Sequence, residues 1–230
     1  MMAGLVRGFS GFGGAMIFVP VASALYSPPL AVAVMFLVDT PITAPLAFRA
    51  MKQCQWRPVL LIFAGAAATV PLGAWLLLHA DPTPVRWAIS LLILASVAAM
   101  ATGWRYARAP GPFGTFAIGN ASGLTSGLAS LGGPPVILFW LGGGGAAAIV
   151  RANIITFFFL NAVNTALAFT TQGLFTPERV GMAVALAPIY VLAIFLGARG
   201  FRFAGEVFYR RLALGLCALS AGASLPLWSG

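Results

Sequence analysis

The sequence predicts an all-α polytopic membrane protein made of two homologous repeats. Of its 230 residues, 60% are hydrophobic and only 7% are charged, which leaves too little polar surface to cover a water-soluble globule. Apolar runs recur along the chain, and several reach the roughly 20 residues that a helix needs to cross the hydrocarbon core of a membrane. A glycine-rich pattern near the start recurs in mid-chain, which indicates a duplication.

Eight apolar segments are expected to be helices. They cover about residues 4–26, 29–50, 57–79, 84–104, 113–141, 146–171, 178–199 and 206–228. The polar stretch at about 105–112 is interpreted as a linker between repeat one (about 1–104) and repeat two (about 113–230). No long hydrophilic stretch interrupts the segments, so residues 1–230 are expected to form a single transmembrane domain.

Two offsets relate the repeats. An offset of 119 places Gly8 on Gly127 and Gly13-Gly14 on Gly132-Gly133. An offset of 121 relates a second set of positions, in which Phe36, Leu46, Ala47 and Phe48 fall on Phe157, Leu167, Ala168 and Phe169. Both sets keep their order along the chain, so the two halves are predicted to be duplicates.

The distribution of basic residues predicts how the segments cross. If all eight cross, six Lys and Arg residues lie on each side, which gives no bias. If the first and fifth segments instead turn back at their Gly-Gly pairs, Arg86 and Arg179 lie on one side. The other side then carries ten: Arg49, Lys52, Arg57, Arg105, Arg108, Arg151, Arg199, Arg202, Arg210 and Arg211. The positive-inside rule favours this second arrangement, with three crossings and one re-entrant hairpin per repeat and an inverted second repeat.

Composition and motifs exclude several classes of function. The net charge of +9 would suggest nucleic acid on a soluble protein, but here it follows from basic residues that flank membrane spans, so no nucleic-acid partner is expected. Cys54 and Cys217 form neither a disulfide framework nor a metal site and are interpreted as small packing residues. No catalytic triad, metal or nucleotide motif is present, so neither an enzyme nor a cofactor is expected.

The Gly-Gly pairs allow two interpretations. A helix that begins after such a pair, with Pro134 in its first turn in the second repeat, would point amide groups and a positive dipole at an anion. Close packing of small residues explains Gly4 with Gly8, or Gly123 with Gly127, equally well. The candidate substrate contacts at the two breaks are Ser10, Gly13, Gly14, Gly132, Gly133 and Pro134.

Asp39 lies in the middle of an apolar segment, where a charge is costly. It is either an ion-coupling site, for a proton or cation, or a structural acid that caps a helix restarted at Pro41. Arg7, near the first Gly-Gly pair, either reaches an anion or, as the favoured interpretation, extends to the membrane surface.

Neutral polar residues occupy matching positions in the two repeats. The offset of 121 places Thr40 on Asn161 and Thr43 on Asn164, and each pair is spaced by three residues on one helical face. Their hydroxyl and amide groups would either bind an oxyanion without a fixed charge or link neighbouring helices. These four residues are also candidate substrate contacts.

The glycine motifs resemble a known family. Gly8-Phe9-Ser10-Gly11-Phe12-Gly13-Gly14 and Gly127-Leu128-Ala129-Ser130-Leu131-Gly132-Gly133-Pro134-Pro135 are similar to motifs of the sulfite exporter TauE/SafE family of bacterial inner-membrane transporters. The resemblance covers essentially the whole chain. It departs from the family at Ala15, where a third glycine is frequent, and in the few residues that precede the first motif.

The resemblance implies a multi-pass protein of the bacterial inner membrane that transports small anions, most of all sulfur-containing oxyanions or organosulfonates. Together with the two breaks, it suggests export by alternating access, with the anion bound between the glycine-broken helices. The expected partners are the anionic substrate, the lipid bilayer and further copies of the chain. The alternative is a non-transporting membrane subunit that scaffolds a partner enzyme and uses its glycines for packing only.

Overall fold

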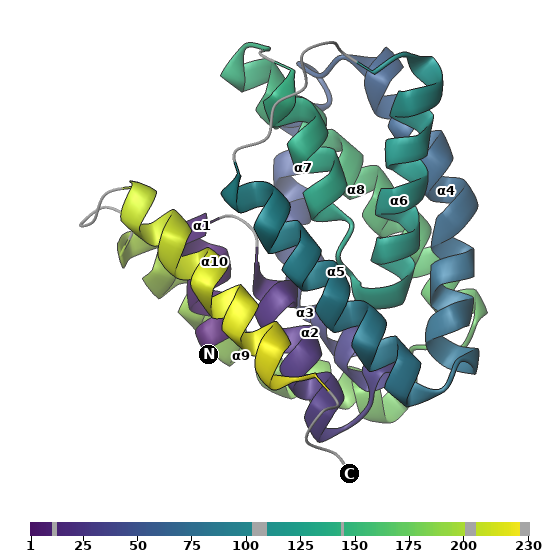
Figure 1. Cartoon of the computed structure of the whole chain (residues 1–230), viewed down its shortest axis with the longest axis vertical. Coiled ribbons are helices and arrows are strands. Elements are labelled where there is room, and N and C mark those ends of the chain that lie inside the picture. Colours follow the sequence, from purple (N-terminus) through teal and green to yellow (C-terminus); the bar gives the residue numbers. More distant parts are fainter. Residues whose placement is uncertain (11–12, 103–109, 144, 201–205, 226–230) are drawn as a thin grey trace. The chain divides into compact units, whose positions relative to one another are not determined.

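The computed structural model describes residues 1–10, 13–102, 110–143, 145–200 and 206–225. Within these ranges, the structure does not describe the side chains of residues 9–10, 42–46, 200 and 206–213. The regular structure of the described ranges is entirely α-helical, which confirms the predicted helical class (Figure 1). Most of the predicted linker at about 105–112 lies outside the described residues.

Each predicted apolar segment contains helix. The helices are α1 (Met2–Ser10), α2 (Gly14–Leu25), α3 (Pro28–Ala50), α4 (Trp56–His79), α5 (Pro82–Ala101), α6 (Pro112–Ala129), α7 (Gly133–Gly142), α8 (Ala147–Thr171), α9 (Pro177–Gly200) and α10 (Glu206–Ala223). The first and fifth predicted segments are the two that are divided, into α1 with α2 and α6 with α7. Both divisions fall at the Gly-Gly pairs.

Helix length and surface both suit a membrane. The helices α4, α5, α8 and α9 are long and apolar enough to cross one. In contrast, α2 has 12 residues and α7 has 10, so they extend only about 18 and 15 Å, against roughly 30 Å of hydrocarbon. Large apolar side chains lie on the outside, including Leu25, Phe113 and Leu219, which are 70% exposed or more. Lipid would cover such a surface.

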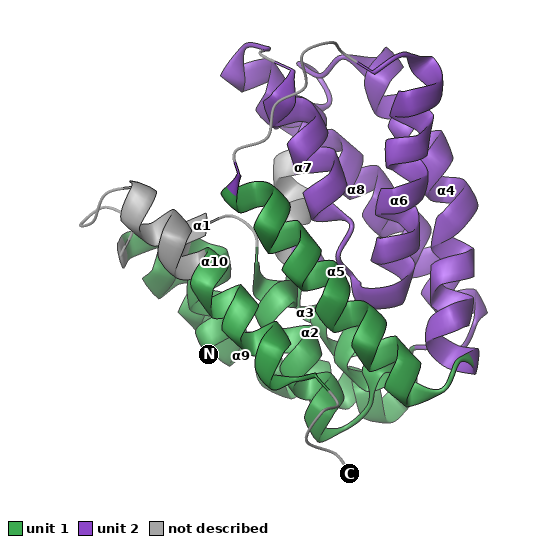
Figure 2. Ribbon diagram, in the orientation of Figure 1, with its two compact units in different colours: residues 1–39, 80–101, 175–230 green, residues 40–79, 102–174 purple. Residues whose placement is uncertain are grey.

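The chain forms two compact units (Figure 2). Unit 1 consists of residues 1–39, 80–101 and 175–230, and unit 2 consists of residues 40–79 and 102–174. Unit 1 therefore holds the α1–α2 break with α5, α9 and α10, whereas unit 2 holds the α6–α7 break with α4 and α8. Each unit combines helices from both halves of the sequence.

In unit 2, α6 packs closely along α4 because glycines remove the side chains between them. A Cβ at Gly119 would overlap the Ile62 carbonyl, and a Cβ at Gly127 would overlap the Val70 carbonyl. From the first contact to the second, the chain advances eight residues along α6 and also eight residues along α4. The two helices therefore run parallel. A Cβ at Gly123 would likewise overlap the Ala66 carbonyl, so the packing interpretation is confirmed for Gly123 and Gly127.

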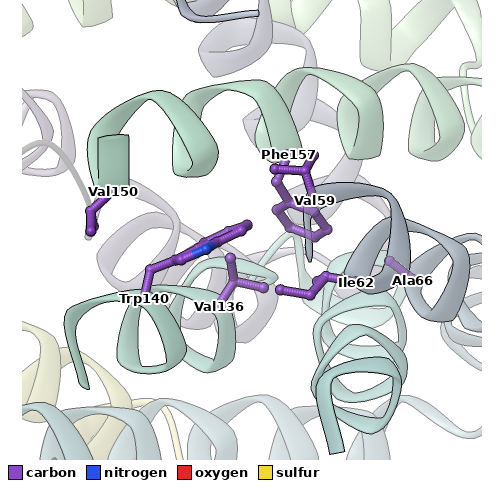
Figure 3. Close-up of a cluster of buried hydrophobic side chains, with 7 residues drawn as sticks. All are labelled: Val59, Ile62, Ala66, Val136, Trp140, Val150 and Phe157. Carbon is purple, nitrogen blue, oxygen red and sulfur yellow. The ribbon is translucent and has the colours of Figure 1, made fainter. Parts of the chain in front are cut away.

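The helix α8 also runs parallel to α4. Near the start of α4, the Gln55 N–H donates to Asn153 Oδ1 at 2.7 Å, and near its end Gln172 Nε2 donates to the Pro71 carbonyl at 3.0 Å. The two helices share with α7 a buried apolar cluster (Figure 3). It consists of Val59, Ile62, Ala66, Val136, Trp140, Val150 and Phe157. This cluster fixes α7 against the parallel helices.

In unit 1, α1 packs on α9 in a similar way. A Cβ at Gly8 would overlap the Ile194 carbonyl, and one at Gly197 would overlap the Leu5 carbonyl. The helix α10 packs against α2 and α5. Its Cys217 is a buried free thiol, and Cys54 of unit 2 is a half-buried one.

Candidate functional site

The second break begins where α6 ends at Ser130. This residue has a left-handed backbone with φ 54°, and its N–H donates to the Ser126 carbonyl at 2.9 Å. Such a conformation is common just after a helix, usually at glycine. Two residues later the chain lies beside α6 again, because Ser122 Oγ donates to the Gly132 carbonyl at 2.6 Å. The chain therefore turns back on itself at this break.

The two glycines of this break differ in why glycine is needed. A Cβ at Gly132 would overlap Ser126 Oγ and would lie 3.0 Å from the Ser122 carbonyl oxygen. A Cβ at Gly133 would lie no closer than 3.6 Å to Ile137 or Phe158, which is ordinary contact. Packing therefore requires the first glycine and leaves room for a side chain at the second.

Buried hydroxyl and amide groups gather at this break. Asn161 of α8 is 6% exposed, and its Nδ2 donates to Ser126 Oγ at 2.8 Å. Because α6 and α8 both run parallel to α4, Ser130 and Thr165 each lie about one turn beyond this pair. Four buried atoms here have no hydrogen-bond partner among the described residues: Ser130 Oγ, Asn161 Oδ1, Asn164 Nδ2 and Thr165 Oγ1.

These groups suit a small polar ligand. A hydroxyl group can donate and accept hydrogen bonds. A carboxamide can present either its oxygen as an acceptor or, when the amide is flipped by 180°, its nitrogen as a donor. The first turn of α7 adds fewer donors than the sequence suggests, because Pro134 and Pro135 have no N–H. In that turn only Gly133 and Val136 carry one, so side chains supply most of the hydrogen-bonding capacity at this break.

The first break ends at Gly13, whose φ of 90° favours glycine. The Ile17 N–H donates to the Gly13 carbonyl at 3.2 Å, and the three amides before Ile17 lie in the first turn of α2, ahead of the helical ladder. Of the other predicted contacts, Thr40 and Asn164 are half-buried. The side chains of Ser10 and Thr43 lie outside the described residues.

A charged cluster lies beside the first break. Arg7 Nε donates to Asp39 Oδ1 at 2.9 Å, and the two side chains are 19% and 25% exposed. Tyr190 Oη of α9 donates to the same oxygen at 2.9 Å. A Cβ built on Gly14 would lie 2.5 Å from Tyr190 Oη and 3.2 Å from Arg7 Cβ, so the cluster adjoins the start of α2.

This cluster corrects two interpretations of the sequence. The Arg7 guanidinium does not extend freely away from the protein, because it is held by Asp39 inside unit 1. Asp39 does not cap a helix restarted at Pro41, because α3 is continuous from Pro28 to Ala50. The two side chains instead form an ion pair with each other.

Sequence reasoning missed Ser122, Ser126, Ser130 and Tyr190 as site residues. The three serines recur at every fourth position, a spacing that places them on one face of α6 and that could have identified them. Tyr190 carries no comparable signal, because its role depends on the packing of α9 against α1.

Comparison with known proteins identifies the family. The family model described as "Sulfite exporter TauE/SafE" matches residues 1–224, which is nearly the whole chain. Searches of curated proteins and of solved structures found no match. The match agrees with the glycine motifs, and the long apolar helices agree with a membrane transporter. The chain therefore belongs to the sulfite exporter TauE/SafE family.

Proposed function

We propose that this protein exports small anions, in particular sulfite-like oxyanions or organosulfonates, across the bacterial inner membrane. In this proposal the anion is bound by hydroxyl and amide groups at the glycine breaks, and alternating access moves it. An anion that crossed alone would be driven outward by the membrane potential, negative inside, by roughly 2.3 kcal/mol per 100 mV. Asp39 is the candidate for coupling to an ion.

One observation carries this proposal: the four polar atoms without partners at the α6–α7 break. A buried polar group without a hydrogen bond costs about 1–3 kcal/mol. Native structures keep few such groups, and water or a ligand usually accounts for them. Neutral donors at a broken helix suit an anion that must bind and then leave.

Matching contacts support the proposed inverted repeat. Under the offset of 119, Gly8 and Leu5 of α1 correspond to Gly127 and Leu124 of α6. Their partners on the long helices correspond as well. Gly8 meets Ile194 as Gly127 meets Val70, and Leu5 meets Gly197 as Leu124 meets Gly73. Each hairpin thus packs on a helix from the other half of the sequence.

The parallel course of α4 and α8 supports the re-entrant arrangement. If all eight apolar segments crossed the membrane, these two helices would cross in opposite directions. If the first and fifth segments return to the side that they entered, α4 and α8 cross in the same direction. The two hydrogen bonds, from Gln55 to Asn153 and from Gln172 to Pro71, fit the second case.

The experiment is a thiol accessibility measurement at Ser130. With Cys54 and Cys217 replaced by alanine, Ser130→Cys should react with a water-soluble thiol reagent in membranes, and ethanesulfonate should slow the reaction. Val59→Cys, in the buried cluster, is the unreactive control, and exposed Asp81→Cys is the reactive one. A Ser130→Cys variant as unreactive as Val59→Cys would instead favour the scaffold subunit with a sealed core.

A further inference from the structure

The connection that Arg7 and Asp39 make between two helices does not require charged side chains. In unit 1 the pair joins α1 to α3, the helix that follows α2. In unit 2 the corresponding contact, from α6 to α8, joins Ser126 to Asn161 and is neutral. Arg7 falls on Ser126 under the offset of 119, and Asp39 lies one residue before Thr40, the counterpart of Asn161. The same connection is thus made without charge in the other repeat.

Charged groups within a membrane span are expensive and usually serve transport. The groups facing the Asp39 carboxylate are Arg7 from α1 and Tyr190 from α9. On α2 the neighbour is Gly14, which has no ionisable side chain. These three groups are one cation, one carboxylate and one neutral hydroxyl, and their charges sum to zero.

We propose that Arg7 is an anion-binding residue of the transport cycle and that Asp39 is its resident counter-ion. This inference rests on the proposed function, because it assumes that the protein transports anions. When a monoanion reaches the guanidinium, the carboxylate leaves and takes up one proton from water, so the cluster stays neutral. When the anion departs, Asp39 releases the proton and returns to Arg7. Each transported monoanion is thereby accompanied by one proton, so that export runs down the combined concentration gradients of the anion and the proton and is not driven by the membrane potential.

The prediction is tested with proteoliposomes and a labelled organosulfonate, which remains a monoanion throughout the neutral range. For wild-type protein, a gradient of one pH unit should drive about tenfold accumulation of the sulfonate on the alkaline side. At equilibrium the free energy of the proton gradient is balanced by that of the opposite sulfonate gradient. An imposed membrane potential should change the accumulation little, since the transported pair has no net charge. A pH dye inside the vesicles should report one proton for each anion.

The matched variants are Asp39→Asn and Asp81→Asn. Asp39→Asn has no titrating group in the cluster, so its accumulation should lose the tenfold response to pH and follow the potential instead. Asp81 is exposed between α4 and α5, and its substitution should leave the coupling as in wild type. The wild-type measurements decide the question even if Asp39→Asn does not fold.

Two failures are distinguishable. Wild-type flux that follows the potential and moves no protons would overturn the counter-ion role of Asp39 while leaving anion transport in place. An absence of sulfonate, sulfite and carboxylate flux above that of protein-free vesicles would overturn the proposed function itself.

Discussion

The adjacent glycines of the second break should respond in opposite ways to alanine. At Gly132 the new methyl group overlaps Ser126 Oγ, and overpacking of this kind costs about 1–3 kcal/mol. If Ser126 rotates away, it loses its hydrogen bond with Asn161, which costs about 1 kcal/mol more. Gly132→Ala should therefore destabilise the protein by about 2–4 kcal/mol.

At Gly133 the methyl group meets nothing closer than 3.6 Å, and the residue opens α7. Replacing a helical glycine by alanine gains up to about 1 kcal/mol. Gly133→Ala should therefore be as stable as wild type or slightly more stable. The two variants change neighbouring residues, yet only Gly132→Ala should lower the stability of the protein.

The assay is thermal unfolding of the purified variants in one detergent. For a chain of this size about 1 kcal/mol corresponds to about 2–4 °C, so Gly132→Ala should lower the Tm by roughly 4–16 °C. Adding Ser126→Ala removes the overlapping oxygen and should restore part of the loss, with a coupling energy of at least about 0.5 kcal/mol. Equal losses in Gly132→Ala and Gly133→Ala would refute the steric argument.

Three further predictions concern the helices and both breaks. Gly127→Ala should lower the Tm by several degrees because its Cβ overlaps α4, whereas Gly215→Ala, with open space around it, should not; equal values would contradict the glycine packing. Ser130→Gly suits the left-handed backbone, so the Tm should hold while sulfonate flux falls, and unchanged flux would remove this hydroxyl from the route. Tyr190→Phe should cost about 1.5–3 kcal/mol, measured by thermal unfolding, because it removes a hydrogen bond to a carboxylate; a variant as stable as wild type would contradict that bond.

The breaks could be predicted from the sequence because their causes are local. Adjacent glycines in an apolar run weaken a helix, and the Gly13-Gly14 and Gly132-Gly133 pairs mark the two places where a predicted segment is divided. Local composition was sufficient for these features.

The residues around the breaks depend on contacts between distant segments. Arg7 and Asp39 are 32 residues apart, and Tyr190 is 151 residues from Asp39. A basic residue near a segment end is usually a topology marker, so the sequence favoured the membrane surface for Arg7. The contact between Arg7 of α1 and Asp39 of α3 forms only in the folded unit 1.

The proposal that this protein transports small anions is tested most directly by measuring anion flux through the wild-type protein. Labelled sulfite, a sulfonate and a small carboxylate are followed in proteoliposomes beside protein-free vesicles. We expect protein-dependent flux that saturates with sulfite or sulfonate concentration, and we expect each of these two anions to inhibit the flux of the other. Flux no greater than that of protein-free vesicles for the whole panel would contradict it.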